Sequence, residues 1–143
     1  MQNKKLQGYT QNSMRERVAG ADPYQIIQML MSGVIDSLNY AKGAIQQKNF
    51  ELKAQQIAKA SAIIESLRSS LRSDIGAEAT ANLNDLYLYM YDRLVDATAN
   101  NDVEIIDEVV ALMREIKTGW DAIPVAAREE AFVKMQPAAA SGA

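Results

Sequence analysis

Histidine and cysteine are both absent from this 143-residue chain. Histidine is the commonest general acid–base group and metal ligand near neutral pH, so its absence argues against catalysis. It also excludes a phosphotransfer histidine and a bundle di-iron site, which needs a Glu-x-x-His pair on each of two helices. Without cysteine there is no disulfide, thiolate metal site or cysteine nucleophile. We therefore expect a protein that is not an enzyme and holds no cofactor.

The chain also lacks any run of about 18 apolar residues, because charged or amide side chains interrupt every candidate. Its first residues, MQNKKLQGYTQNS, contain no apolar core of a secretory signal, and no glycine-rich phosphate loop follows. The 15 basic and 18 acidic residues are interspersed, with an isoelectric point near 5.0. Such a surface does not suit a polyanion. We expect a cytoplasmic protein that neither inserts into a membrane nor binds nucleic acid.

Apolar residues make up 48% of the chain, which is typical of a globular protein. They recur at spacings of three and four in four segments, a helical pattern. The segments are about 22–47, 50–71, 77–98 and 103–123. Short loops join them, so the sequence predicts an all-α protein, an antiparallel four-helix bundle. We assign 1–124 to the bundle, including an N-terminal arm at 1–21, and 125–143 to a short, partly disordered C-terminal extension.

Several residues mark the helix ends. Asp22 is the expected N-cap of the first helix, with Pro23 at its first position. The segment 73–76, which ends in glycine, predicts a turn before the third helix. Asn101, with Glu104 three residues later, predicts a capping box at the start of the fourth helix.

Three tyrosines, Tyr87, Tyr89 and Tyr91, alternate along the third helix. Residues two positions apart on a helix are separated by a rotation of 200°, so the three tyrosines cannot share one face. Tyr87 and Tyr91 are expected near the core, and Tyr89 on the opposite side. A single exposed tyrosine is common, but tyrosine is also enriched at interfaces, so Tyr89 is either an ordinary surface residue or a partner contact.

The first helix carries more apolar residues than one narrow stripe needs. They are Ile26, Ile27, Met29, Leu30, Met31, Val34 and Ile35. This excess indicates either a wide buried face covered by the N-terminal arm or a groove for a partner helix, with methionines as adaptable contacts.

The fourth helix carries a group of acidic residues, Glu104, Asp107 and Glu108. They form either a solvated acidic face or a weak site for a hard cation.

Three segments together resemble the flagellar secretion chaperone family FliS. They are Ala21-Asp22-Pro23, NLNDLYLYMYDRL at 82–94, and 100–124 with its Trp120-Asp121-Ala122-Ile123-Pro124 end. The resemblance covers about 6–124. It departs from the family where Asp22 replaces a usual serine, and where Met31 and Ser32 replace an aromatic and an acid.

The resemblance implies a cytoplasmic chaperone that binds the C-terminal segment of new flagellin and prevents its premature polymerisation. It also implies delivery of the complex to a component of the flagellar type III export gate. In this family the N-terminal arm can cover an apolar surface, and its aliphatic-x-x-Tyr pattern is matched by Leu6 and Tyr9. The candidate partner contacts are Leu6, Tyr9, Met29, Met31, Tyr87, Tyr89 and Met90.

A competing interpretation is a generic helical adaptor without a flagellin client. In that case the surplus apolar surface would be buried in a homodimer.

Overall fold

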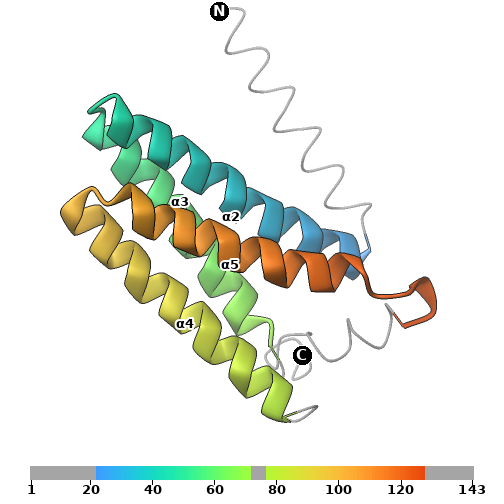
Figure 1. Cartoon of the computed structure of the whole chain (residues 1–143). Helices are drawn as coiled ribbons and strands as arrows, with labels where there is room; N and C mark the ends of the chain where they lie inside the picture. The colour runs from blue at the N-terminus through green and yellow to red at the C-terminus, as the bar shows by residue number, and fades with distance from the viewer. Residues whose placement is uncertain (1–21, 72–76, 128–143) are drawn as a thin grey trace, which may run out of the picture.

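The computed structural model describes residues 22–71 and 77–127, and the side chains of 77–80 are not described. Four helices make up this part, with no strand: α2 (Pro23–Gln46), α3 (Phe50–Ser69), α4 (Ala77–Asn100) and α5 (Val103–Asp121). They lie side by side as an antiparallel bundle (Figure 1). The predicted all-α four-helix fold is confirmed. The predicted arm at 1–21, the turn at 73–76 and the chain from 128 onward lie outside the described residues.

Each helix packs against two neighbours. Helix α2 contacts α3 and α5, and α4 contacts the same two helices, so the order around the bundle is α2, α3, α4, α5. The ends confirm the antiparallel direction of α2 and α5. Tyr24 at the start of α2 meets Trp120 at the end of α5, while Lys42 near the end of α2 pairs with Asp107 near the start of α5 at 2.9 Å.

The start of α2 follows the predicted capping. The Asp22 side chain accepts a hydrogen bond from the Gln25 backbone N–H at 2.8 Å, and Pro23 occupies the first turn. Both residues suit the start of a helix. The Asp side chain accepts from a backbone N–H that has no partner within the helix, and Pro has no backbone N–H to satisfy.

The predicted cap of α5 is wrong by one residue. Asp102 is the N-cap, and its side chain accepts from the backbone N–H groups of Glu104 and Ile105. Asn101 instead has φ of 52°, a left-handed conformation that asparagine tolerates better than most residues. It makes the turn that allows Asp102 to start the helix.

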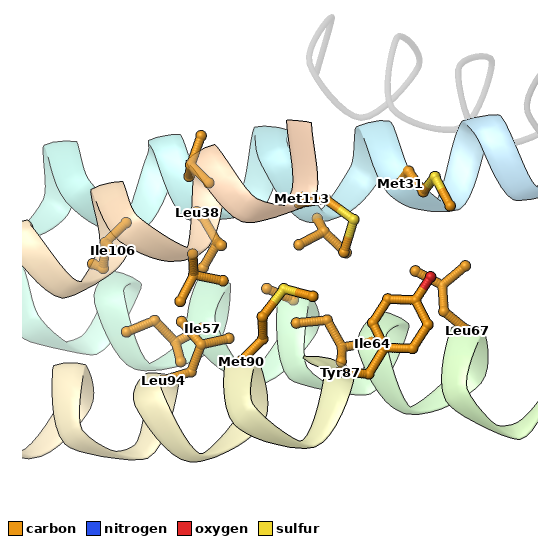
Figure 2. Packing of buried hydrophobic residues seen from close by; sticks show 14 of the residues in the cluster. Met31, Leu38, Ile57, Ile64, Leu67, Tyr87, Met90, Leu94, Ile106 and Met113 are labelled. Atoms are coloured by element: carbon orange, nitrogen blue, oxygen red, sulfur yellow. The ribbon is translucent and has the colours of Figure 1, made fainter. Parts of the chain in front are cut away.

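The core is filled by aliphatic, methionine and tyrosine side chains from all four helices (Figure 2). Its fully buried large members are Met31, Val34, Leu38, Ile64, Leu67, Tyr87, Met90, Leu94, Ile106, Val109 and Met113. These positions repeat the spacing of three and four that the sequence shows, so periodicity alone places most of them. Lys53 is the exception, because a lysine side chain is seldom buried and this one is only 7% exposed.

Lys53 is buried because its ammonium group has partners at the end of the neighbouring helix α4. Its Nζ donates to the Thr98 carbonyl at 3.1 Å and to Asn101 Oδ1 at 2.6 Å. The Thr98 carbonyl lies in the last turn of α4, where the helix dipole favours a positive charge. Lys53 also lies 5.3 Å from the centre of the Phe50 ring. A buried lysine therefore ties the start of α3 to the end of α4.

Tyr24 and Trp120 join the opposite end of the bundle. Their rings stack with centroids 5.4 Å apart. The Tyr24 hydroxyl donates to the Trp120 carbonyl at 3.0 Å, and the Trp120 indole N–H donates to the Tyr24 carbonyl at 3.1 Å. Gln28 adds a further bond to Asp121 at 2.8 Å. Two reciprocal hydrogen bonds thus fix the first turn of α2 against the last turn of α5.

One core hydroxyl has no such partner. Tyr87 is fully buried, and its hydroxyl makes no hydrogen bond. Burial raises the pKa of this phenol far above its ordinary value of 10.0, so the group stays neutral. An unsatisfied buried hydroxyl costs about 1–3 kcal/mol.

We expect Tyr87→Phe to raise the free energy of unfolding by about 1 kcal/mol, since it removes the unsatisfied group and keeps the ring. Urea denaturation measures this as a higher midpoint with an unchanged slope. Tyr24→Phe is the matched control, and should lower stability because its hydroxyl is bonded to Trp120. A loss of stability in Tyr87→Phe would contradict the assignment.

Candidate functional site

An apolar groove of about 620 Å³ runs between α3 and α4. Its lining residues are Ala54, Ile57, Ala58, Ser61, Ala62, Glu65, Tyr91, Leu94, Val95, Thr98 and Ala99. We call this surface the α3–α4 groove. The α3 residues recur at spacings of three and four along the flank that faces α4, so they lie in one row. Buried Ile57 and Leu94 are among these lining residues.

The groove exists because the α3 wall is built from small side chains. Ala54, Ala58, Ser61 and Ala62 leave space that larger residues would fill. Opposite them, Val95 is 57% exposed. The surface is apolar and unfilled, which is the kind of feature that marks a binding site in a soluble protein.

Polar contacts between α3 and α4 occur only near the two ends of the groove in the described part of the chain. At one end Lys53 bonds Thr98 and Asn101. At the other, Arg68 pairs with Glu65 at 3.0 Å and reaches Asn84 at 3.4 Å. Between these points no hydrogen bond or ion pair joins the described parts of the two helices, and most of the lining side chains are apolar. The groove is therefore fixed in width at its ends and has a nonpolar middle.

Polar side chains gather on a second face, between α4 and α5. The Glu108 carboxylate accepts from the Tyr89 hydroxyl and from Arg93 Nε, each at 2.8 Å. The Arg93 bond, followed by the Tyr89 bond, lowers the pKa of Glu108 below its ordinary 4.5. The same carboxylate raises the pKa of Tyr89. At the end of α5, the bond from Lys117, more than that from Gln28, lowers the pKa of Asp121 below 3.8.

These lowered pKa values predict how stability depends on pH. A carboxylate whose pKa is lower in the folded state stabilises the fold above its ordinary pKa, and this contribution disappears as pH falls through the lowered value. The free energy of unfolding should be nearly constant from about pH 6 to 8, because no histidine titrates there, and should decline below about pH 4.5.

Urea denaturation at a series of pH values tests this. Glu108→Gln should lower stability at neutral pH and reduce the decline in acid. Glu115→Gln, which changes an exposed carboxylate on the same helix, is the control and should leave the profile unchanged. If the free energy of unfolding of Glu108→Gln falls in acid as much as that of the wild type, this carboxylate does not have the proposed role.

The structure separates the sequence-predicted contact residues into three groups. Met31, Tyr87 and Met90 are fully buried, so a partner docking on the bundle surface does not touch them. Met29 is half-buried and Tyr89 is 44% exposed. The other two, Leu6 and Tyr9, lie outside the described residues. The prediction that Tyr89 faces away from the core is confirmed, although its hydroxyl is held by Glu108.

Tyr87 and Tyr91 are both expected near the core, and the structure buries only Tyr87 completely. Tyr91 is 38% exposed and lines the α3–α4 groove, whereas Tyr87 has no exposed surface. Four residues rotate the helix by 400°, so Tyr91 is turned 40° beyond Tyr87, toward α3. Sequence reasoning also missed Ala58 and Val95. The signal for them is the row of alanines at 54, 58 and 62 on α3.

The acidic residues of α5 do not form a cation site. Asp107 binds Lys42 on α2, and Glu108 binds Arg93 and Tyr89 on α4. Over 22–71 and 81–127 no three potential metal-ligating side chains come together. These two carboxylates link neighbouring helices.

Comparison with known proteins decides the family. The model of the family described as "Flagellar protein FliS" matches residues 5–127, which is most of the chain. The chain belongs to the FliS family. The sequence-based resemblance is thereby confirmed, and with it the prediction that the protein is not an enzyme, because FliS is a family of chaperones.

The FliS relatives carry a common description. The chain is 42% identical over 120 residues to the "Flagellar secretion chaperone FliSB" of Pseudomonas aeruginosa, covering 84% of this chain and 95% of that protein. It is 40% identical over 119 residues to the "Flagellar secretion chaperone FliS" of Vibrio cholerae, covering 83% and 88%. The Bacillus subtilis protein of the same description is 32% identical over 112 residues, covering 78% and 80%.

These similarities support a flagellar export chaperone, whose partner is a client protein. Among the described helices, none is long and apolar enough to cross a membrane.

Proposed function

We propose that this FliS-family protein is a cytoplasmic export chaperone that binds the C-terminal segment of flagellin in the α3–α4 groove. Binding there keeps flagellin from polymerising before export and allows its delivery to a component of the flagellar type III export gate. The observation that carries the proposal is an open apolar groove on a member of a secretion chaperone family.

The shape of the groove favours a helical client. The lining from Ala54 to Glu65 spans about 16 Å, at 1.5 Å per residue, or about three helical turns. Small residues on one wall let a second helix approach closely. An amphipathic helix that lies in such a groove uses apolar anchors at i, i+3, i+4 and i+7. Three turns provide room for that pattern.

The groove alone is too small for the whole interaction. A disordered segment that folds on binding typically buries about 1,000–3,000 Å² and spends about 2–5 kcal/mol on becoming ordered. The client therefore extends beyond the groove. Half-buried Met29 and exposed Tyr89 remain proposed contacts. We also propose that Leu6 and Tyr9 of the N-terminal arm cover an apolar surface of the free protein, and that the client replaces them there.

Calorimetric titration against full-length flagellin, and against flagellin without its C-terminal segment, tests the proposal. We expect tight binding to the intact protein and none to the truncated one. Binding to neither form would leave the adaptor interpretation. Light scattering of the free protein then shows whether the apolar surface is buried in a homodimer.

A further inference from the structure

The outer edge of the α3–α4 groove is acidic along α4. Asp85, Asp92 and Asp96 are exposed and separated by seven and four residues, so they lie on one side of the helix. We call these three residues the α4 acidic ridge. Only Asp96 has a basic neighbour in the described part of the chain, Arg93 at 3.5 Å.

The acidic ridge lies beside an apolar row. Leu88 and Val95 are 39% and 57% exposed, and Asp92 is four residues after the first and three before the second. On a helix these spacings make the three side chains neighbours. An occupant that covers Leu88 and Val95 therefore passes within reach of the Asp92 carboxylate.

The opposite edge of the groove differs in charge. The α3 side carries charges of both signs: Glu51 and Lys59 are exposed, and Glu65, which lines the groove, pairs with Arg68 at 3.0 Å. Arg93 is the only basic residue of α4, and it is bonded to Glu108 on the side facing α5. The α4 edge of the groove is thus anionic, whereas the two acids and two bases on the α3 side balance.

From this asymmetry we propose that the groove selects a helical segment with basic side chains along one flank of its apolar stripe. The inference rests on the proposed function for its client, and adds the charge pattern that the client must carry. Pairing of the basic flank with the α4 acidic ridge fixes which way round the helix lies. Complementary charges at a rim contribute to specificity and association rate more than to affinity.

Three synthetic amphipathic helical peptides test the inference. They share one apolar stripe and differ only at the positions along one flank, which are Lys, Gln or Glu. The lysines of the Lys peptide should form exposed ion pairs with the α4 acidic ridge. This peptide should therefore bind between about threefold and a hundredfold more tightly than the Gln peptide, and the Glu peptide should bind more weakly than the Gln peptide. The preference should shrink when salt is raised from about 50 mM to about 500 mM.

A double variant, Asp85→Asn with Asp92→Asn, should abolish most of the preference. The control, Asp36→Asn with Glu115→Gln, also removes two exposed acids but lies on α2 and α5, and should keep it. Equal binding of the three peptides, no binding by any of them, or a preference unchanged in the double variant would each overturn the inference.

Titration with flagellin tests the proposed function separately from the charge preference. If flagellin binds through its C-terminal segment while the peptides show no charge preference, the chaperone function stands and the ridge has no role. If the Lys peptide is preferred but flagellin does not bind, the charge selectivity stands and the client is a different protein.

Discussion

Replacing Trp120 by alanine is expected to lower the free energy of unfolding by about 3–5 kcal/mol. The ring is 7% exposed and stacks on Tyr24, and its N–H holds the Tyr24 carbonyl. The substitution leaves a cavity where α2 begins and α5 ends, and it removes the indole hydrogen bond that joins the two helices there. Urea denaturation measures the loss.

Two further variants separate the causes. Trp120→Phe keeps an aromatic ring but removes the indole donor, so it should cost about 1–2 kcal/mol. Tyr40→Ala removes an aromatic from α2 that is 66% exposed, and should change stability by no more than about 0.5 kcal/mol. A loss below about 1 kcal/mol for Trp120→Ala would mean that this end of the bundle is not fixed by the ring pair.

The second large effect is expected in client binding. Ala58→Gln combined with Val95→Gln places an uncharged polar side chain on each wall of the α3–α4 groove. Full burial of a valine side chain is worth about 1.5–3 kcal/mol, so its loss should weaken flagellin binding at least about tenfold. Calorimetric titration measures the change, and the unchanged net charge leaves the acidic ridge unaffected.

The matched control is Ala111→Gln combined with Val125→Gln. It makes the same two substitutions at an exposed alanine of α5 and at a valine that is 75% exposed beyond α5. Its affinity should equal that of the wild type. An unaltered affinity in the groove variant, with both proteins folded, would exclude this groove as the binding surface.

Most of the fold follows from local signals in the sequence. The helical periodicity predicts four helices, and Asp22 with Pro23 marks the start of α2, because these signals depend on neighbours within one helix. The start of α5 was missed by one residue, since Asn101 and Asp102 are both good N-caps. The choice depends on the left-handed φ of Asn101 and its bond to Lys53, which lies 48 residues away.

The candidate site was less predictable. Methionine suits adaptable surfaces, which favours Met31 and Met90 as partner contacts, yet each lies four residues from a core aliphatic, Ile27 and Leu94 respectively. For these two methionines, the helical spacing predicts burial better than the residue type predicts a surface contact. The groove itself depends on the flanks of α3 and α4 meeting, which a single-helix pattern does not specify. The burial of Lys53 likewise requires partners from another helix.

Photo-cross-linking tests the central claim most directly. A photoreactive amino acid is placed at position 58 in the groove or at position 111 on α5, and each protein is irradiated with intact flagellin or with flagellin lacking its C-terminal segment. The account predicts a cross-link from position 58 to intact flagellin alone. A cross-link from position 111 only, or one from position 58 that survives the truncation, would contradict it.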